Sequence, residues 1–287
     1  MSNLITLTTD FGLIDGFVGV MKGVMLAIHP DARFVDITHD IAPQNIRQGA
    51  FLLANSVPYF PPAAIHLCIV DPGVGSTRRA LAVQVGETTL IGPDNGVLSF
   101  ALAALQARRG AAPVAFELNN PRYWLDRVST TFHGRDIFSP CAAHLARGVP
   151  LHELGAPVSE WVTLAPPAPV RREDGALVGR IIYIDRYGNL VSDIDAETLA
   201  AFARAPHGGE AGSAAQGTPV HQGAAIVVSI AGRKLHGLVR TYADVAPGEL
   251  AVLIGSPWKL EIARRNGNAA EALGAAVGDE IVVHKAT

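Results

Sequence analysis

The first half of the chain alternates two patterns of hydrophobic and polar positions. Short runs rich in β-branched residues, such as LITLTTD (4–10) and AAIHLCIVD (63–71), predict buried strands. The segment DGFVGVMKGVMLAIHP (15–30) instead repeats its apolar residues at helical spacing. Because strands alternating with helices of this length indicate βαβ units, residues 1–164 are predicted to form an α/β domain with a mostly parallel central sheet.

The same patterns predict the remaining elements of this domain. Strands are expected at ARFVDITHD (32–40), RALAVQV (79–85), TTLIGPDNG (88–96) and PVAFEL (113–118), and helices at NIRQGAFLLANSVPYF (45–60), VLSFALAALQARRG (97–110) and GRDIFSPCAAHLARG (134–148). The segments RALAVQV and TTLIGPDNG are expected to pair with each other.

The second half of the chain has a different pattern. The Pro-rich stretch LAPPAPVRREDGA (164–176) predicts a linker over 165–175. Beyond it, short strands separated by turn signals predict a smaller β-barrel domain over 176–287, with one main helix at DAETLAAFA (195–203). A Gly-, Ala- and Ser-rich insert at about 206–223 is predicted to be mobile.

Composition narrows the choice of partner and compartment. The 287 residues carry a formal net charge of −3 without a long Lys/Arg run, so neither nucleic acid nor an anionic membrane is an expected partner. The N-terminus has no signal-peptide pattern, and no run of 18 apolar residues predicts a membrane-spanning helix. Cys68 and Cys141 lie in apolar segments, which indicates two buried free thiols and a cytoplasmic protein.

Three of the predicted strands end in an acid, namely Asp10, Asp40 and Asp71. Ligands of open α/β sheets bind outside the carboxyl ends of the strands, although acids are also placed there for solubility. The Asp10 carboxylate is suited to accept two hydrogen bonds from a vicinal diol such as a ribose. Its alternative role is to cap the next helix, for which Asp15 is better placed.

The loop VDPGVGSTRR (70–79) resembles a phosphate-binding loop only superficially. It lacks a terminal Lys-Ser/Thr, and the Asp71 carboxylate would repel a phosphate. The loop is therefore either a simple turn into the next strand or the site of a buried pair between Asp71 and Arg78 that faces the crevice of the sheet. Arg79 is interpreted as structural, in an ion pair at the base of the next strand.

His133, in TTFHGRDIFSP, lies at a strand-to-helix turn. A histidine there can be a base, an acid or a ligand, while a solitary histidine is more often structural. Its neighbours Arg135 and Asp136 are expected to form a local ion pair. The pair His39-Asp40 offers metal ligands, but a structural role is favoured, because the chain has no metal-binding motif.

Candidate binding residues of the second domain cluster in IDRYGNLVSDI (184–194). Asp185 and Asn189 are expected to pair across a turn, and an asparagine can also pair with a purine edge. Tyr187 and Tyr242 are candidates for stacking on a flat base, with packing as the alternative for each.

Seven motifs taken in order resemble the S-adenosyl-L-methionine hydrolase family, also called SAM hydroxide adenosyltransferases, which is related to the fluorinating and chlorinating enzymes. They are TTDFGLIDGFVG, DITHDIAPQNIRQGA, VDPGVGSTRR, GPDNGVL, FHGRDIFSP, IDRYGNLVSDI and LEIARRNGNAAE. The resemblance covers nearly the whole chain outside Pro206–Gly223. It implies an α/β domain joined to a β-barrel, and a homotrimer whose active sites lie between the first domain of one subunit and the second domain of the next.

The resemblance also implies roles for single residues. Asp71, Arg78 and His133 correspond to the set around the attacking water. Tyrosine is usual in the halogenating relatives at the positions of Asp71 and His133, so the chain resembles the water-using branch. The implied substrate contacts are Asp10 for ribose, Asn189 for adenine, Tyr187 and Tyr242 beside the base, and Asp185, Ser256 and Glu261 near the methionine group.

The implied reaction is hydrolysis of S-adenosyl-L-methionine to adenosine and L-methionine by attack of water at C5′, without a metal or redox cofactor. Which of Asp71 and His133 is the base stays open. Three alternatives also stay open: a halogenase that uses chloride or fluoride, a metal-dependent phosphohydrolase built on Asp10, His39, Asp40 and Asp71, and a non-catalytic protein that binds S-adenosyl-L-methionine or adenosine.

Overall fold

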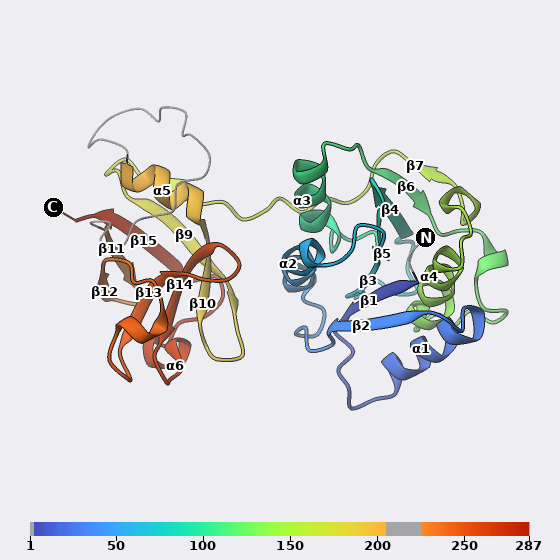
Figure 1. Cartoon of the computed structure of the whole chain (residues 1–287), viewed down its shortest axis with the longest axis horizontal. Helices are drawn as coiled ribbons and strands as arrows, with labels where there is room; N and C mark the ends of the chain where they lie inside the picture. The colour runs from blue at the N-terminus through green and yellow to red at the C-terminus, as the bar shows by residue number, and fades with distance from the viewer. Residues whose placement is uncertain (1–2, 205–225, 287) are drawn as a thin grey trace. The chain divides into compact units, whose positions relative to one another are not determined.

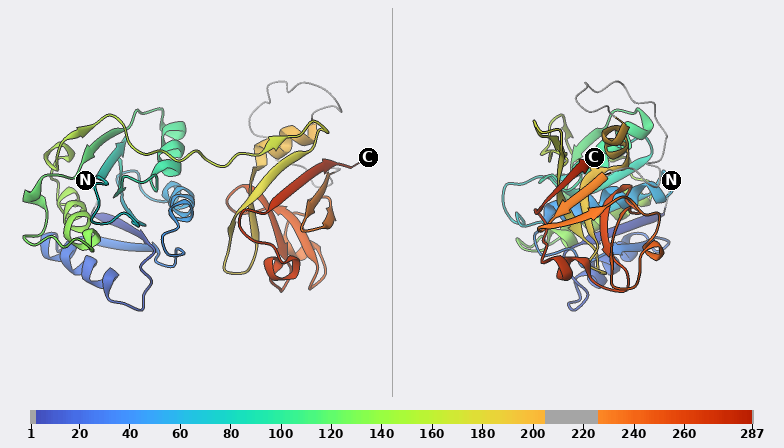
Figure 2. Two further views of the ribbon diagram at one scale, coloured as in Figure 1. Left: turned by 180° about the vertical axis from the view of Figure 1, so that it is seen from behind. Right: turned by 90° about the vertical axis from the view of Figure 1, so that its left-hand side faces the viewer.

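The computed structural model describes residues 3–204 and 226–286, so the insert predicted at about 206–223 lies outside the described residues. The chain divides into two compact units, Met1–Ala165 and Pro166–Thr287 (Figures 1 and 2). No helix in the described ranges is both long enough and apolar enough to cross a bilayer. Both cysteines are buried and free, as predicted.

Unit 1 is built on one seven-stranded sheet. Its spatial order is β2 (Arg33–Thr38), β1 (Leu4–Thr9), β3 (Ile65–Ile69), β5 (Thr88–Pro93), β4 (Ala80–Val85), β6 (Val114–Glu117) and β7 (Pro157–Val158). The pairs β1–β2, β1–β3 and β3–β5 are parallel, whereas β4–β5, β4–β6 and β6–β7 are antiparallel. The sheet is therefore mixed, and the prediction of a mostly parallel sheet holds only for the half that contains β1 and β3.

The change of direction starts at the hairpin of β4 and β5. Val85 pairs with Thr88, which leaves a two-residue turn that begins at Gly86, with φ of 61°. A turn this short can join only antiparallel strands, because a parallel pair needs a long crossover. The predicted pairing of these two segments is confirmed.

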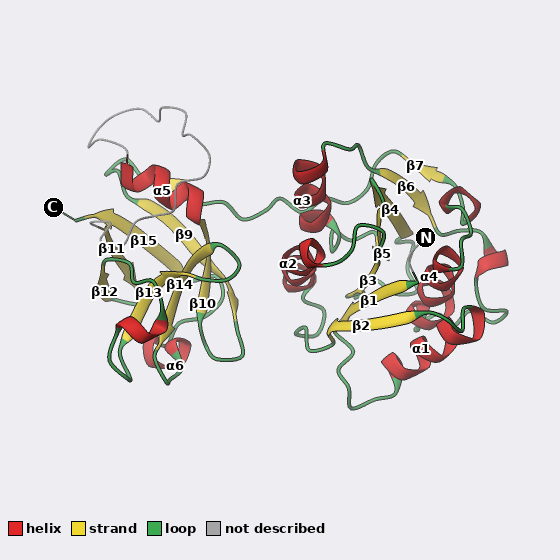
Figure 3. Cartoon of the chain, viewed as in Figure 1, coloured by secondary structure: helices red, strands yellow, loops and turns green. Residues whose placement is uncertain are grey.

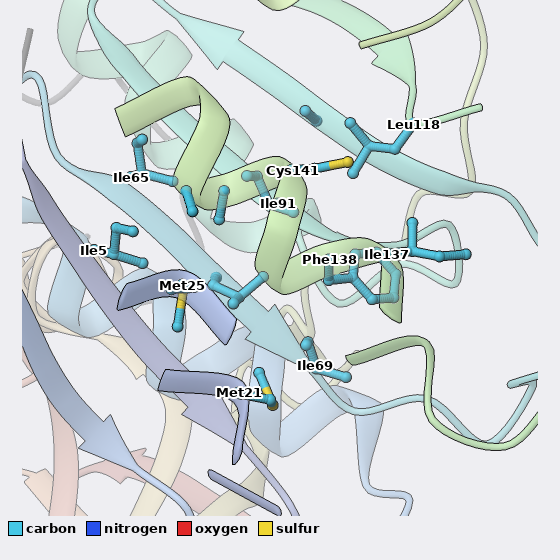
Figure 4. Close-up of a cluster of buried hydrophobic side chains, with 14 of the residues drawn as sticks. Ile5, Met21, Met25, Ile65, Ile69, Ile91, Leu118, Ile137, Phe138 and Cys141 are labelled. Atoms are coloured by element: carbon cyan, nitrogen blue, oxygen red, sulfur yellow. The ribbon is translucent and has the colours of Figure 1, made fainter. Parts of the chain in front are cut away.

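Helices cover both faces of this sheet (Figure 3). The helices α1 (Phe17–Ile28) and α4 (Ser139–Ala146) pack together on one face, and α2 (Ile46–Ser56) and α3 (Ser99–Arg109) pack together on the other. The face under α1 and α4 holds the core drawn in Figure 4. The short helical turns of the unit are η1 (Val57–Tyr59), η2 (Pro121–Tyr123), η3 (Gly134–Phe138) and η4 (Leu151–Glu153).

Two helix starts differ from the prediction. Gly16 occupies the N-cap of α1 without a side-chain cap, so Asp15 does not have the capping role expected of it. The helix predicted over 134–148 opens with the π-helical turn η3 before α4 begins. Pro140 explains this difference, because it has no N–H to donate to Asp136, whose carbonyl accepts from the Leu125 N–H at 3.0 Å instead.

Unit 2 is an antiparallel sheet. Its order is β12 (Arg233–His236), β11 (Ile226–Ile230), β15 (Glu280–Lys285), β9 (Leu177–Ile184), β10 (Leu190–Asp195), β14 (Lys259–Arg264) and β13 (Leu250–Ile254), with β8 (Val170–Arg171) paired to β9. The end strands β12 and β13 contact each other, so the sheet closes into a nearly complete barrel around its own apolar core. The strand β8 falls within the range predicted as linker.

The helices of unit 2 are α5 (Ala196–Arg204), α6 (Ala269–Leu273) and the short turn η5 (Tyr242–Asp244). The predicted main helix at 195–203 is confirmed as α5, which packs on β10 and β14.

Candidate active site

The loop that follows β3 folds back on itself. The Val74 N–H donates to the Asp71 carbonyl at 3.2 Å, and the Ser76 N–H donates to the Gly73 carbonyl at 3.1 Å. These two turns return the chain so that Arg78 meets Asp71, with Nε at 2.9 Å from Oδ1 and Nη2 at 2.5 Å from Oδ2. Only 10% of the Arg78 side chain and 6% of the Asp71 side chain are exposed, so the loop holds the buried pair that was one of its two interpretations.

His133 joins this pair through Arg78. The Arg78 Nη2 group donates to His133 Nδ1 at 2.9 Å. Because a guanidinium has no acceptor, Nδ1 must be unprotonated, and a neutral His133 then carries its hydrogen on Nε2. Burial and the positive charge of Arg78 lower the pKa of His133, so the neutral form is favoured at pH 7. The Phe138 ring lies 5.2 Å from the guanidinium carbon and completes the support of Arg78.

A cavity of about 110 Å³ opens beside the three side chains. It is lined by Phe11, Phe17, Ile69, Asp71, Val74, Thr131, Phe132, His133 and Gly134. The rings of Phe11, Phe17 and Phe132 contact one another edge to face, with centroids 5.2 to 6.0 Å apart. The cavity therefore joins a hydrogen-bonded set of charged groups to an apolar aromatic wall.

The buried Asp136 fixes the segment that carries His133. Its carboxylate accepts from Arg135 Nε at 2.6 Å, which confirms the local ion pair, and from the Ser129 N–H at 2.8 Å. Burial by itself raises the pKa of Asp136, but these hydrogen bonds lower it below the usual value, so the group is a carboxylate. The segment from Ser129 to His133 is thereby held in place.

Asp10 follows β1, which pairs in parallel with β3, so Asp10 lies at the same edge of the sheet as Asp71 and is partly exposed. Its Oδ2 accepts the Gln44 N–H at 2.7 Å, and Gln44 has a positive φ of 66°. Asp10 therefore does not cap α1. Arg79 has the structural role expected of it, because it pairs with Asp94 at 2.6 Å and donates to the Glu160 carbonyl at 2.7 Å.

The structure favours the structural interpretation of His39. Its Nδ1 lies 2.8 Å from Thr9 Oγ1 and its Nε2 lies 3.2 Å from Asp36 Oδ1. Asp40 is exposed, and its main-chain N–H donates to Thr38 Oγ1 at 3.1 Å. Among residues 3–204 and 226–286, no group of three or more His, Cys, Asp or Glu side chains is arranged to hold a metal ion.

In unit 2, Asp185 organises the turn between β9 and β10. Its Oδ1 accepts the N–H groups of Tyr187 and Asn189 at 2.8 and 2.9 Å, and its Oδ2 accepts Asn189 Nδ2 at 2.8 Å. The expected pairing is therefore present. Because the Asn189 amide nitrogen is engaged, its carbonyl oxygen is the atom left to accept from a ligand. Asn268, at the start of α6, packs directly against Gly188 of this turn, and any side chain at position 188 would collide with it.

Glu261 and Tyr242 form a second contact in the same unit. The Tyr242 hydroxyl donates to Glu261 Oε1 at 2.8 Å, and Glu261 is only 3% exposed. Burial and the nearby Asp185 charge raise the pKa of Glu261. These two carboxylates near each other suit a cationic amine. Tyr187, 77% exposed, and the exposed Ser256 form no side-chain hydrogen bond with Glu261 or Tyr242 within the described residues.

Sequence analysis missed several residues of these sites. Phe11 and Phe132 line the cavity and adjoin Asp10 and His133 in the chain, so the dipeptides DF and FH were the available signal. Phe138 carried no signal, since an apolar residue in a helix is normally packing. Gly255 carried no signal either, although a side chain at this position would collide with Glu261 Oε2.

Comparisons with known proteins agree with this architecture. The sequence profile of the SAM hydroxide adenosyltransferase N-terminal domain matches residues 5–155, and that of the C-terminal domain matches residues 179–282. A protein of Salinispora tropica named (R)-S-adenosyl-L-methionine hydrolase is 42% identical over 281 residues, 97% of each chain. A Thermus thermophilus protein of the same name is 36% identical over 93% of each chain.

More distant relatives and solved structures extend the comparison. A fluorinase of Actinopolyspora mzabensis is 27% identical over 68% of this chain and 73% of its own. The crystal structure of an uncharacterized conserved protein from Thermotoga maritima superposes with a TM-score of 0.84 at 31% identity, covering 98% of this chain and 100% of that one. Two matched domain profiles and relatives of this similarity over nearly the full length show that the chain belongs to the SAM hydroxide adenosyltransferase family.

Proposed function

We propose that this protein hydrolyses S-adenosyl-L-methionine to adenosine and L-methionine by attack of water on C5′. The observation that carries the proposal is the hydrogen-bonded set of Asp71, Arg78 and His133 beside a small cavity with aromatic walls. The names of the relatives at 36 to 42% identity support the same reaction.

The leaving group of this reaction needs no protonation. The sulfonium departs as a neutral thioether, so no general acid is needed and no resident metal or redox cofactor is called for. The site must instead supply a water molecule that is in line with the C5′–S bond and partly desolvated. The rings of Phe11, Phe17 and Phe132 serve this second need, because they line the cavity next to Asp71 and His133.

The hydrogen bonds favour Asp71 as the group that accepts the water proton. Nδ1 of His133 already accepts from Arg78, so the ring presents Nε2–H, a donor that can orient the oxygen of the water. The Asp71 carboxylate accepts from Arg78 but has lone pairs left for a water molecule. The positive charge of Arg78 stabilises hydroxide character in the nucleophile.

Binding is assigned to the other predicted residues. Asp10 accepts the ribose hydroxyls, the Asn189 carbonyl oxygen accepts from adenine, and Tyr187 and Tyr242 flank the base. Asp185 and Glu261 attract the methionine ammonium, and Ser256 lies near its carboxylate. Asp71, Arg78 and His133 belong to unit 1, whereas the residues assigned to adenine and methionine belong to unit 2. The proposal therefore includes the homotrimer expected from the resemblance, in which two neighbouring subunits complete each site. Two free buried thiols fit a cytoplasmic protein.

An isotope experiment tests the reaction. The purified protein is incubated with S-adenosyl-L-methionine in ¹⁸O-labelled water, and the products are analysed by mass spectrometry. We expect one ¹⁸O atom in the 5′-hydroxyl of adenosine. Release of adenine, or label recovered in methionine, would contradict attack at C5′.

Two additions to the same assay separate the alternatives. A halogenase would form product only when chloride or fluoride is added, and a metal-dependent phosphohydrolase would lose activity with a chelator. Binding of S-adenosyl-L-methionine without any turnover would indicate the non-catalytic alternative and overturn the proposal.

A further inference from the structure

The buried residue His39 lies directly behind the proposed ribose-binding turn. Thr9 is the last residue of β1 and is fully buried, and its Oγ1 lies 2.8 Å from Nδ1 of His39, which is only 4% exposed. The same Thr9 oxygen accepts the N–H of Phe11 at 3.3 Å. The side chain of Thr9 therefore bridges His39 and the main chain on the far side of Asp10.

Thr9 and His39 are joined whichever ring nitrogen of His39 carries the hydrogen. The Thr9 hydroxyl accepts from Phe11 and keeps one proton and a second lone pair, so its 2.8 Å contact with His39 Nδ1 is a hydrogen bond for either tautomer of the ring. On the other side of the ring, Nε2 of His39 lies 3.2 Å from Asp36 Oδ1 but has no hydrogen-bond partner among the described residues. The other oxygen of Asp36 is bonded to Lys22 Nζ of α1 at 2.6 Å. Hydrogen bonds therefore join His39 to the end of β1, and Asp36 to α1.

The main chain of His39 holds the same turn from another direction. Its carbonyl accepts the Gly12 N–H at 2.8 Å. Residues 9 to 12 are thus fastened by the side chain of His39 through Thr9 and by the backbone of His39 through Gly12. Asp10 lies between these two attachments, and within the described residues its carboxylate accepts one hydrogen bond, from the Gln44 N–H.

We propose that His39, acting through Thr9, is a positioning residue that fixes the direction of the Asp10 carboxylate toward the ribose hydroxyls of the substrate. This inference rests on the proposed function, since it takes Asp10 as the group that binds the ribose. Neither His39 nor Thr9 touches the substrate in this scheme, because both are buried behind the turn.

The experiment compares two ligands on the full-length protein. Binding of adenosine and of 2′-deoxyadenosine is measured by calorimetry for the wild type, Thr9→Val and His39→Leu. A correctly held Asp10 should favour adenosine by about tenfold, the value of one good hydrogen bond to a charged group. In both variants we expect this ratio to fall to about two, with KM for S-adenosyl-L-methionine raised more than kcat is lowered.

The chain offers close controls. Thr6 lies on the same strand, is fully buried, and pairs with His66 Nδ1 at the same 2.8 Å distance. Thr6→Val should therefore lower the melting temperature as Thr9→Val does but leave the ligand ratio unchanged. Thr9→Ser keeps the hydroxyl and should restore the wild-type ligand ratio. This result would show that the hydroxyl of Thr9 is the group responsible for the ratio.

The outcomes separate this inference from the proposed function. If the wild type prefers adenosine but Thr9→Val and His39→Leu keep the full preference, His39 is not a positioning residue. An equal change of the ratio in Thr6→Val would also overturn the inference, because it would mark a general packing effect. A wild type that neither hydrolyses S-adenosyl-L-methionine nor distinguishes the two nucleosides would overturn the proposed function itself.

Discussion

At the scale of single residues, the chain contains two adjacent arginines that each pair with a buried aspartate. Arg78 bonds Asp71 after β3, and Arg79 bonds Asp94 after β5. Only the first pair adjoins the aromatic cavity and His133. Asp71→Asn should therefore lower kcat by about 10²-fold or more with a small change in KM, because it removes the proton acceptor but keeps the shape.

Asp94→Asn is the matched control for that substitution. It removes a carboxylate of similar burial, 5% exposed, from a similar arginine pair. We expect it to lower the melting temperature while kcat stays within about threefold. Equal losses of kcat in steady-state assays of the two variants would contradict a special role for Asp71.

His66 leads to a prediction about stability and pH. Burial and the charge of Arg109 lower its pKa to about 4, from 6.5 in an unfolded chain. Between these two pH values the unfolded state binds a proton that the folded state does not, so stability is present above pH 6.5 and is lost as the pH falls toward 4. The loss amounts to about 3 kcal/mol, at 1.36 kcal/mol per pH unit.

Urea unfolding at several pH values checks this loss. The variant His66→Gln should show a shallower fall of unfolding free energy between pH 6.5 and 4 than the wild type. An identical pH dependence in the two proteins would show that His66 is not the group responsible.

At the scale of elements, one glycine decides how two loops meet. Gly75 has a φ of 77°, and a side chain there would collide with the carbonyl of Thr130, close to His133 in the chain. Gly75→Ala should push the loop that carries Arg78 away from the segment that carries His133 and lower kcat by about tenfold or more.

Gly110→Ala provides the comparison for this backbone effect. Gly110 ends α3 with a φ of 63°, and no atom lies within 4 Å of the position of an added side-chain carbon. Both variants should lose about 1 kcal/mol of stability from the left-handed backbone, but only Gly75→Ala should lose activity in the hydrolysis assay. A similar kcat for the two variants would exclude loop contact as the cause.

The elements also show where sequence patterns succeed and where they stop. The apolar pattern predicts β3 and α3 well. A strand buried on both faces, such as β3, is a continuous apolar run, and a helix buried on one face, such as α3, repeats its apolar residues at helical spacing. Periodicity does not encode strand direction, so the antiparallel pairs β4–β6 and β6–β7 were missed. It also could not predict the π-helical turn before α4, which depends on the missing N–H of Pro140.

At the scale of the whole molecule, the fold assembles a site that the sequence only partly predicts. Seven positions separate Asp71 from Arg78, and a short loop can bring them together, so charge and spacing alone made their pairing one of two interpretations. His133 is 55 positions from Arg78, and it meets the pair only because η3 and the loop after β3 reach the same place. Its membership of the set followed from the resemblance to a family, since no local pattern records a contact over that distance.

The proposed trimer can be tested by complementation between two variants of the chain. If one subunit supplies Asp71 and the next supplies Asp185, two inactive variants should complement each other. In mixed trimers formed by co-expressing Asp71→Asn and Asp185→Ala at equal levels, about a quarter of the sites should combine two wild-type halves, because each half is wild-type in half of the chains. Activity should therefore return to about a quarter of the wild-type value.

Either variant alone, or the two mixed after trimers have formed without exchange, should stay inactive. If co-expression yields trimers of both chains without any activity, the two residues must act within one chain, and the proposal that neighbouring subunits complete each site would be wrong.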